Sequence, residues 1–139
     1  MKHLANLTVI LGVAAGPALA EMHMDSSNLI RTRDITGGNI YSMADPMNDA
    51  DWDSWEVDAV GSDWNDIGEI EDIILDKSGQ VIGVVAEVGG FLDIGDKHVM
   101  LPIADVRLTP VDDRTYSVVT RLSEEQLEEM EAVDEAWWN

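Results

Sequence analysis

Cysteine is absent from all 139 residues of this chain. Its absence excludes disulfides, zinc–thiolate centres, cysteine nucleophiles and thiol redox chemistry. A chain of this length forms one modest domain with short additions. Without covalent cross-links, that domain must be held together by its hydrophobic core.

Basic residues are scarce, because only eight Lys and Arg oppose 28 Asp and Glu, for a net charge of -20. A charge of this sign repels nucleic-acid backbones and anionic lipid headgroups. We therefore expect no nucleic-acid partner. The same charge attracts cations and basic protein surfaces, although general solubility explains it equally well.

A long apolar run is also missing, since the apolar N-terminal segment from Leu4 to Ala15 is too short to span a bilayer stably. Lys2 precedes this segment and Ala18-Leu19-Ala20 follows it, which is the pattern of a secretory signal peptide. Residues 1–20 are thus predicted to be removed, leaving a periplasmic or secreted protein without stable membrane insertion. An uncleaved anchor helix is the alternative.

The segment from Ile67 to Val88 predicts a β-hairpin. Its isoleucines recur at helical spacing over 67–75, but Gly68 and the β-branched content favour a strand there. Asp76 to Gly79 has the composition of a turn. The residues that follow, up to Val88, are apolar on both faces, which is typical of a central strand or a closed barrel.

Further segments complete a small barrel. An entry strand is expected within 29–42, a glycine-rich corner at 89–91 and a strand over 97–101. Residues 104–111 and 115–121 have the pattern of a final hairpin. The predicted fold is therefore all-β: a small antiparallel β-barrel of about six strands, with a short C-terminal α-helix and an acidic inserted loop.

Domain boundaries follow from the same patterns. Residues 21–28 are expected to form a flexible leader, and residues 29–122 the barrel domain. The acidic, tryptophan-containing segment 43–63 has no sustained apolar period and is interpreted as an inserted loop. Residues 123–139 form a helix and tail, because Ser123 and Gln126 have the spacing of a capping box.

Several of these motifs, in order, resemble the PRC-barrel family, named for the photosynthetic reaction-centre H subunit. They are Ile67-Gly68-Glu69-Ile70, the turn at 76–79, the segments 88–92 and 93–97, and Leu101-Pro102. The resemblance is closest to secreted members and implies an adaptor fold rather than an enzyme. An exported chain does not meet the ribosomal or reaction-centre partners known for the family, so the resemblance implies protein contact without naming the partner.

Two sets of residues are candidate metal ligands. The mature N-terminus Glu21-Met22-His23 would offer an amine, backbone amides and an imidazole, which suit Cu(II). The alternating carboxylates of Asp49, Asp51 and Asp53 would suit Ca²⁺, although the run lacks the glycine and glutamate of an EF-hand loop. A chance histidine and a solvated acidic loop are the respective alternatives.

Tryptophans are the candidate partner contacts. Trp52, Trp55 and Trp64 are too many for a solvated loop, and we expect them to fold back over a barrel opening or to anchor a partner. Trp137 and Trp138 near the C-terminus present the same choice.

Signals for catalysis are weak. Asp66, Glu69, Glu71 and Asp72 could supply paired carboxylates for glycoside hydrolysis, but surface acidity explains them more simply. His98 is interpreted as a structural side chain of a strand. The sequence has no phosphate-binding loop, dinucleotide fingerprint or nucleophile elbow. We therefore predict a non-catalytic interaction module, an adaptor of the cell envelope. The alternative is a periplasmic metal-binding protein.

Overall fold

The computed structural model describes residues 25–45, 47–89 and 97–138. The predicted signal peptide and the candidate copper ligands Glu21, Met22 and His23 lie outside these ranges. So does most of the glycine-rich corner expected at 89–91. No helix in the described ranges is both long and apolar enough to cross a membrane.

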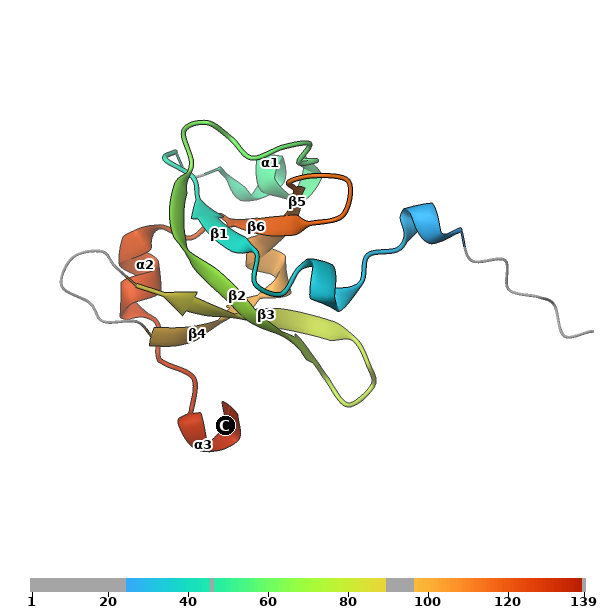
Figure 1. Ribbon diagram of the computed structural model, residues 1–139. Helices are drawn as coiled ribbons and strands as arrows, with labels where there is room; N and C mark the ends of the chain where they lie inside the picture. The colour runs from blue at the N-terminus through green and yellow to red at the C-terminus, as the bar shows by residue number, and fades with distance from the viewer. Residues whose placement is uncertain (1–24, 46, 90–96, 139) are drawn as a thin grey trace, which may run out of the picture.

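The described chain folds around one six-stranded sheet (Figure 1). Its spatial order is β4-β3-β2-β1-β6-β5. In chain order the strands are β1 (Asn39–Ser42), β2 (Asn65–Leu75), β3 (Val81–Val88), β4 (Lys97–Pro102), β5 (Val106–Pro110) and β6 (Tyr116–Thr120). The mostly-β fold predicted from the sequence is confirmed, as are its six strands. Within the described strands, however, no pairing of β4 with β5 closes the sheet into a barrel.

The sheet is mixed rather than wholly antiparallel, because β1 runs parallel to β6. The prediction of an antiparallel barrel is wrong for this pair. Strands β1 to β4 alternate in direction, and β5 is antiparallel to β6. It follows that β5 points the same way as β4. The 3-10 turn η3 (Ile103–Asp105) therefore carries the chain from β4 into β5 without reversing it.

The ambiguous segment that begins at Ile67 is a strand, part of the 11-residue β2. It pairs with β3 from Gly68 opposite Val88 to Leu75 opposite Val81, with an irregularity between Ile70 and Asp72. The turn forms as its composition predicts. The Asp76 carboxylate accepts hydrogen bonds from the backbone N–H of Ser78 (2.8 Å) and of Gln80 (3.2 Å).

The main core occupies one face of the sheet. Its most buried members include Ile40 of β1, Ile70 of β2, Ala86 of β3 and Val99 of β4. Helix α2 (Glu124–Glu129) adds Leu127 to this core.

The predicted capping box of α2 is confirmed, because Ser123 and Gln126 exchange hydrogen bonds. At the other end of the helix, the Lys97 ammonium donates to the carbonyl oxygens of Glu128 and Met130, at 2.7 and 2.6 Å. These bonds satisfy carbonyls that the end of a helix leaves without partners.

The segment 43–63 is not simply a loop, because it contains helix α1 (Asp49–Ser54). Asn48 caps this helix by accepting from the backbone N–H of Asp51 at 3.0 Å. Asp49 and Asp51 complement the dipole of the first turn. A six-residue helix is too short to produce a sustained apolar period, which is why the sequence pattern missed it.

The N-terminal part of the described chain is less regular than expected. The entry strand predicted within 29–42 is reduced to β1, and the 3-10 turns η1 (Ser26–Asn28) and η2 (Thr32–Asp34) precede it. The last element of the described chain is the short helix α3 (Glu135–Trp138).

Replacing Gly68 by alanine should destabilise the fold by about 2–4 kcal/mol. Gly68 has a φ of 155°, and a Cβ built there would collide with the backbone carbonyl of Glu87 across the β2–β3 pair. The measurement is urea unfolding followed by circular dichroism. Gly79→Ala is the matched control: its φ is 90° but its surroundings are open, so it should cost only about 1–2 kcal/mol. Equal losses would contradict a steric role for Gly68.

The Asp76 turn should make part of the stability dependent on pH. The Ser78 hydroxyl, followed by the Gln80 backbone N–H, lowers the pKa of Asp76 below its ordinary value. A lowered pKa stabilises the fold above the unfolded-state pKa of about 3.9, and this contribution disappears as pH falls through the lower folded pKa. We expect Asp76→Asn to lose less stability than the wild type between pH 5 and pH 2. The exposed control Asp113→Asn should lose as much stability as the wild type. Parallel pH profiles for all three proteins would refute this.

Candidate functional site

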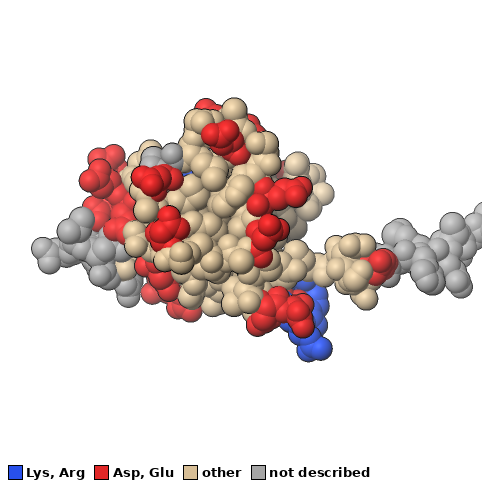
Figure 2. Space-filling view, turned by 90° about the horizontal axis from the view of Figure 1, so that it is seen from above, with Lys and Arg blue, Asp and Glu red and all other residues tan. Residues whose placement is uncertain are grey.

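The surface is dominated by acid. Figure 2 shows clusters of Asp and Glu side chains spread over the visible face, while the prominent cluster of Lys and Arg lies beside the N-terminal segment. Several of the basic side chains are engaged in ion pairs within the protein. Arg121 contacts Asp49 and Asp105, at 2.6 and 2.7 Å, and Arg31 contacts Asp34 at 2.7 Å. The surface therefore has much unneutralised negative charge to offer a partner.

The C-terminal tail, residues 131–138, runs beside the edge strand β4. The Val133 backbone N–H donates to the carbonyl oxygen of His98 at 2.8 Å. This bond covers part of an otherwise open strand edge, where unpaired backbone groups invite pairing with another chain. The tail is thus fixed to the sheet before α3 begins.

An aromatic stack extends outward from β4. The His98 ring lies 6.0 Å from Trp138, and Trp138 lies 6.2 Å from Trp137, measured between ring centroids. Trp138 is half-buried in this stack, whereas Trp137 at its outer end is 57% exposed. An indole held by its neighbours and open to solvent is well suited to contact with another molecule.

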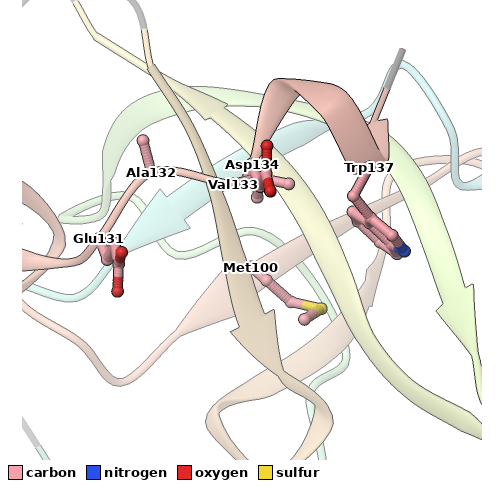
Figure 3. A pocket seen from close by; sticks show the side chains of 6 residues that line it. All are labelled: Met100, Glu131, Ala132, Val133, Asp134 and Trp137. Atoms are coloured by element: carbon pink, nitrogen blue, oxygen red, sulfur yellow. The ribbon is translucent and has the colours of Figure 1, made fainter.

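A pocket of about 340 Å³ lies between β4 and the tail (Figure 3). Met100 points into it from β4 and is 38% exposed, and Trp137 flanks it on one side. Glu131 lies on the other side, and Asp134 precedes α3. We call this site the tail pocket; it is lined by Met100, Glu131, Ala132, Val133, Asp134 and Trp137. It combines an apolar floor with two carboxylates.

The tryptophans of the insertion have a different environment. Trp52 is 0% exposed, and its Nε1 donates to the carbonyl oxygen of Ala104 at 2.8 Å. Arg107 packs over its ring with the guanidinium carbon 4.7 Å from the centroid. Trp55 is half-buried and contacts both Trp52 and Trp64, with ring centroids 5.8 and 5.7 Å away. In this structure Trp52 is therefore a core residue and is not accessible to a partner.

The insertion covers the face of the sheet opposite the main core. Tyr41 and Arg107 are both register partners of Val119, and they contact Trp64 and Trp52 respectively. Val119 is fully buried although it is not part of the main core. The tryptophans of α1 and of the following segment thus fold back onto β1, β6 and β5.

The candidate calcium ligands are not brought together. The Asp49 carboxylate contacts Arg121, and Asp53 lies 3.9 Å from Arg107. Asp51 instead accepts from the side-chain amide of Asn48 at 2.6 Å. The three carboxylates are carried by a helix rather than by a loop, and two of them face arginines. This arrangement does not supply the several converging oxygens that Ca²⁺ requires.

The sequence patterns did not identify Met100 and Val133 as residues of a site, although one signal for Met100 was present. On β4, Val99 and Leu101 are fully buried. Alternation along a strand then directs Met100 to the opposite face. An apolar side chain on the outer face of an edge strand is an indicator of a covered or binding surface. The position of Val133 depends on its bond to the His98 carbonyl, which has no local sequence signal.

Comparison with models of known protein families identifies a match over about half of the chain. The family described as PRC-barrel domain matches residues 57–125, which begin after α1 and include β2 to β6 and the start of α2. The tail pocket combines Met100 from within this range with residues that follow it. A comparison with curated proteins found no match.

Two single tryptophan substitutions should separate structural from surface roles. Trp52→Ala removes a fully buried indole and should cost about 3–5 kcal/mol of unfolding free energy. Trp137→Ala removes an exposed ring and should stay within about 0.5 kcal/mol of the wild type. Urea unfolding followed by far-ultraviolet circular dichroism avoids the change in fluorescence that each substitution causes. A large loss for Trp137→Ala would show that the outer tryptophan holds the tail in place instead of being free to bind.

Proposed function

The chain belongs to the PRC-barrel domain family, and from this premise we propose that it is a non-catalytic protein-binding module that acts as an adaptor in the cell envelope. The observation that carries the proposal is the tail pocket, in which exposed Trp137 and Met100 form an apolar contact surface beside two carboxylates. Tryptophan is enriched among the residues that dominate binding energy at protein interfaces.

The partner is a basic segment that carries one large apolar side chain. Glu131 and Asp134 line the tail pocket, and the chain as a whole has a net charge of -20. A cavity of about 340 Å³ is at the small end of ligand sites. It accommodates a single inserted side chain, while Lys or Arg residues on either side of that side chain meet the carboxylates. Opposite charges also accelerate encounter between the two proteins.

Export to the periplasm is part of the proposal. Its support is the basic, apolar and small-residue pattern of residues 1–20, which is typical of a secretory signal peptide. The acidic charge makes nucleic acid an unsuitable partner. The partner is then another protein of the envelope or periplasm.

A binding role suits the chemistry of the tail pocket better than catalysis does. Its polar side chains are two carboxylates, and its remaining lining side chains are apolar. Neither a nucleophile paired with a base nor a histidine is among the residues that line it. We therefore expect binding without turnover.

The proposal is tested with a random peptide library selected on the immobilised protein. We expect the selected peptides to contain a large apolar residue flanked by Lys or Arg. Trp137→Ala should weaken their binding about thirtyfold, as for an interface residue worth about 2 kcal/mol. Their affinity should also fall as salt is raised, because the charge contribution is screened. Titration calorimetry measures both effects.

Val111→Ala is the matched control, because Val111 is an equally exposed apolar side chain (55%) that follows β5 and does not line the pocket. It should leave peptide affinity unchanged. Peptides that bind equally well to Trp137→Ala, or a selection that enriches no sequence, would contradict a docking role for the tail pocket. If these results confirm binding at the tail pocket, the natural partner can be captured from envelope extracts on the immobilised protein, with Trp137→Ala as the comparison.

A further inference from the structure

Three side chains on neighbouring strands converge on the face of the sheet opposite the main core. They are Glu71 of β2, Glu87 of β3 and His98 of β4. One ligand atom from each lies within 4.8 Å of the others, and all three side chains are half-buried. The sequence-based candidates for metal binding included none of them. From this geometry we propose that the three residues form a binding site for a divalent transition-metal ion, with Zn²⁺ as the best fit.

The strand register explains why these side chains meet. Glu87 and His98 are direct partners across the β3–β4 pair. Ala86, Val88 and Val99 belong to the main core, so alternation turns Glu87 and His98 to the opposite face.

Glu71 reaches the same place because of an irregularity in β2. The register shifts between Ile70 and Asp72, which leaves Glu71 as the extra residue of a bulge. Bulges redirect side chains and are frequent beside functional sites. All three ligands are thus held by paired strands rather than by loops, and a metal site gains affinity from such preorganisation.

The donor set selects the class of metal. One imidazole nitrogen and two carboxylate oxygens suit Zn²⁺ and its transition-metal neighbours, whereas Ca²⁺ and Mg²⁺ prefer oxygen ligands alone. Among the described residues the site has three protein ligands, which leaves room for water at a fourth position. Two carboxylates held this close together repel each other, and a divalent cation neutralises both charges. The charge of -20 on the whole chain further attracts a cation to this face.

Ion pairing between His98 and Glu87 is the competing explanation for the cluster. The Nε2 and Oε2 atoms of this pair are 4.0 Å apart, which is longer than a hydrogen bond. Two ligands bonded to one tetrahedral ion at about 2.0–2.2 Å are about 3.4 Å apart, so a small adjustment of these side chains brings the pair into range. The ammonium of Lys97, the neighbour of His98, is directed to the end of α2 instead.

Trp138 completes the surroundings of the site, because its ring is 6.0 Å from the His98 ring. An aromatic neighbour limits the access of water and restricts the orientation of the imidazole. Its indole also provides an optical reporter, since a paramagnetic ion such as Co²⁺ or Cu²⁺ bound at His98 should quench its fluorescence.

The test titrates Zn²⁺ and Co²⁺ into the purified protein by calorimetry and absorption. We expect one strong Zn²⁺ site and, for Co²⁺, visible absorption bands typical of nitrogen and oxygen ligation. His98→Ala and Glu71→Gln should each weaken Zn²⁺ binding by more than about tenfold. Saturation with Zn²⁺ should raise the melting temperature of the wild type and leave that of His98→Ala unchanged.

His23→Ala is the matched control, because it removes the histidine of the alternative N-terminal site and leaves the strand site intact. It should retain wild-type Zn²⁺ affinity. Glu125→Gln, an exposed carboxylate on α2, controls for the loss of one negative charge. Circular dichroism establishes that each variant is folded. Absence of Zn²⁺ binding in the wild type, loss of binding in His23→Ala alone, or unchanged binding in folded His98→Ala would each overturn the proposal.

Discussion

β1 joins two halves that would otherwise be separate small sheets. It is only four residues long, yet it pairs with β2 on one side and with β6 on the other. Its Ile40 is fully buried in the main core. Backbone bonds just before the strand reinforce this position, because Gly37 donates to the carbonyl of Ile70 and Ile70 donates to that of Gly38. The β2–β3–β4 meander and the β5–β6 hairpin share one core because this short strand holds both.

The two faces of the sheet are completed by different parts of the chain. One face forms the main core, closed at one side by Leu127 of α2. The other is covered by appended segments: the insertion packs Trp52 against Arg107, and the tail attaches to β4 through Val133. The extent of each cover decides whether an aromatic residue is buried or exposed. Trp52 lies beneath its cover and is fully buried, whereas Trp137 lies at the outer limit of the tail and remains exposed.

Local signals in the sequence predicted local structure well. The Asp76 turn, the β2–β3 hairpin and the Ser123 capping box each depend on neighbouring residues, and each is present. The parallel pairing of β1 with β6 depends on how η3 carries β4 into β5, and this has no signature within either strand. The sequence named Trp137 as a candidate partner contact but did not single out Met100, which lines the same pocket. The tail pocket joins Met100 to tail residues that are 31 or more positions away in the sequence. Contacts between such distant segments produce no periodic pattern in the sequence.

His98 lies between the tail pocket and the cluster that it forms with Glu71 and Glu87. Its carbonyl holds the tail through Val133, while its ring lies between Trp138 and Glu87. A backbone contact and a side-chain contact of one residue thus fix the tail pocket relative to the carboxylates of β2 and β3. Arg107 and Arg121, which lie beside α1, are engaged with Asp53 and with Asp49 and Asp105, respectively. The net charge of -20 therefore favours the cationic ligands proposed above, a basic partner segment or a metal ion.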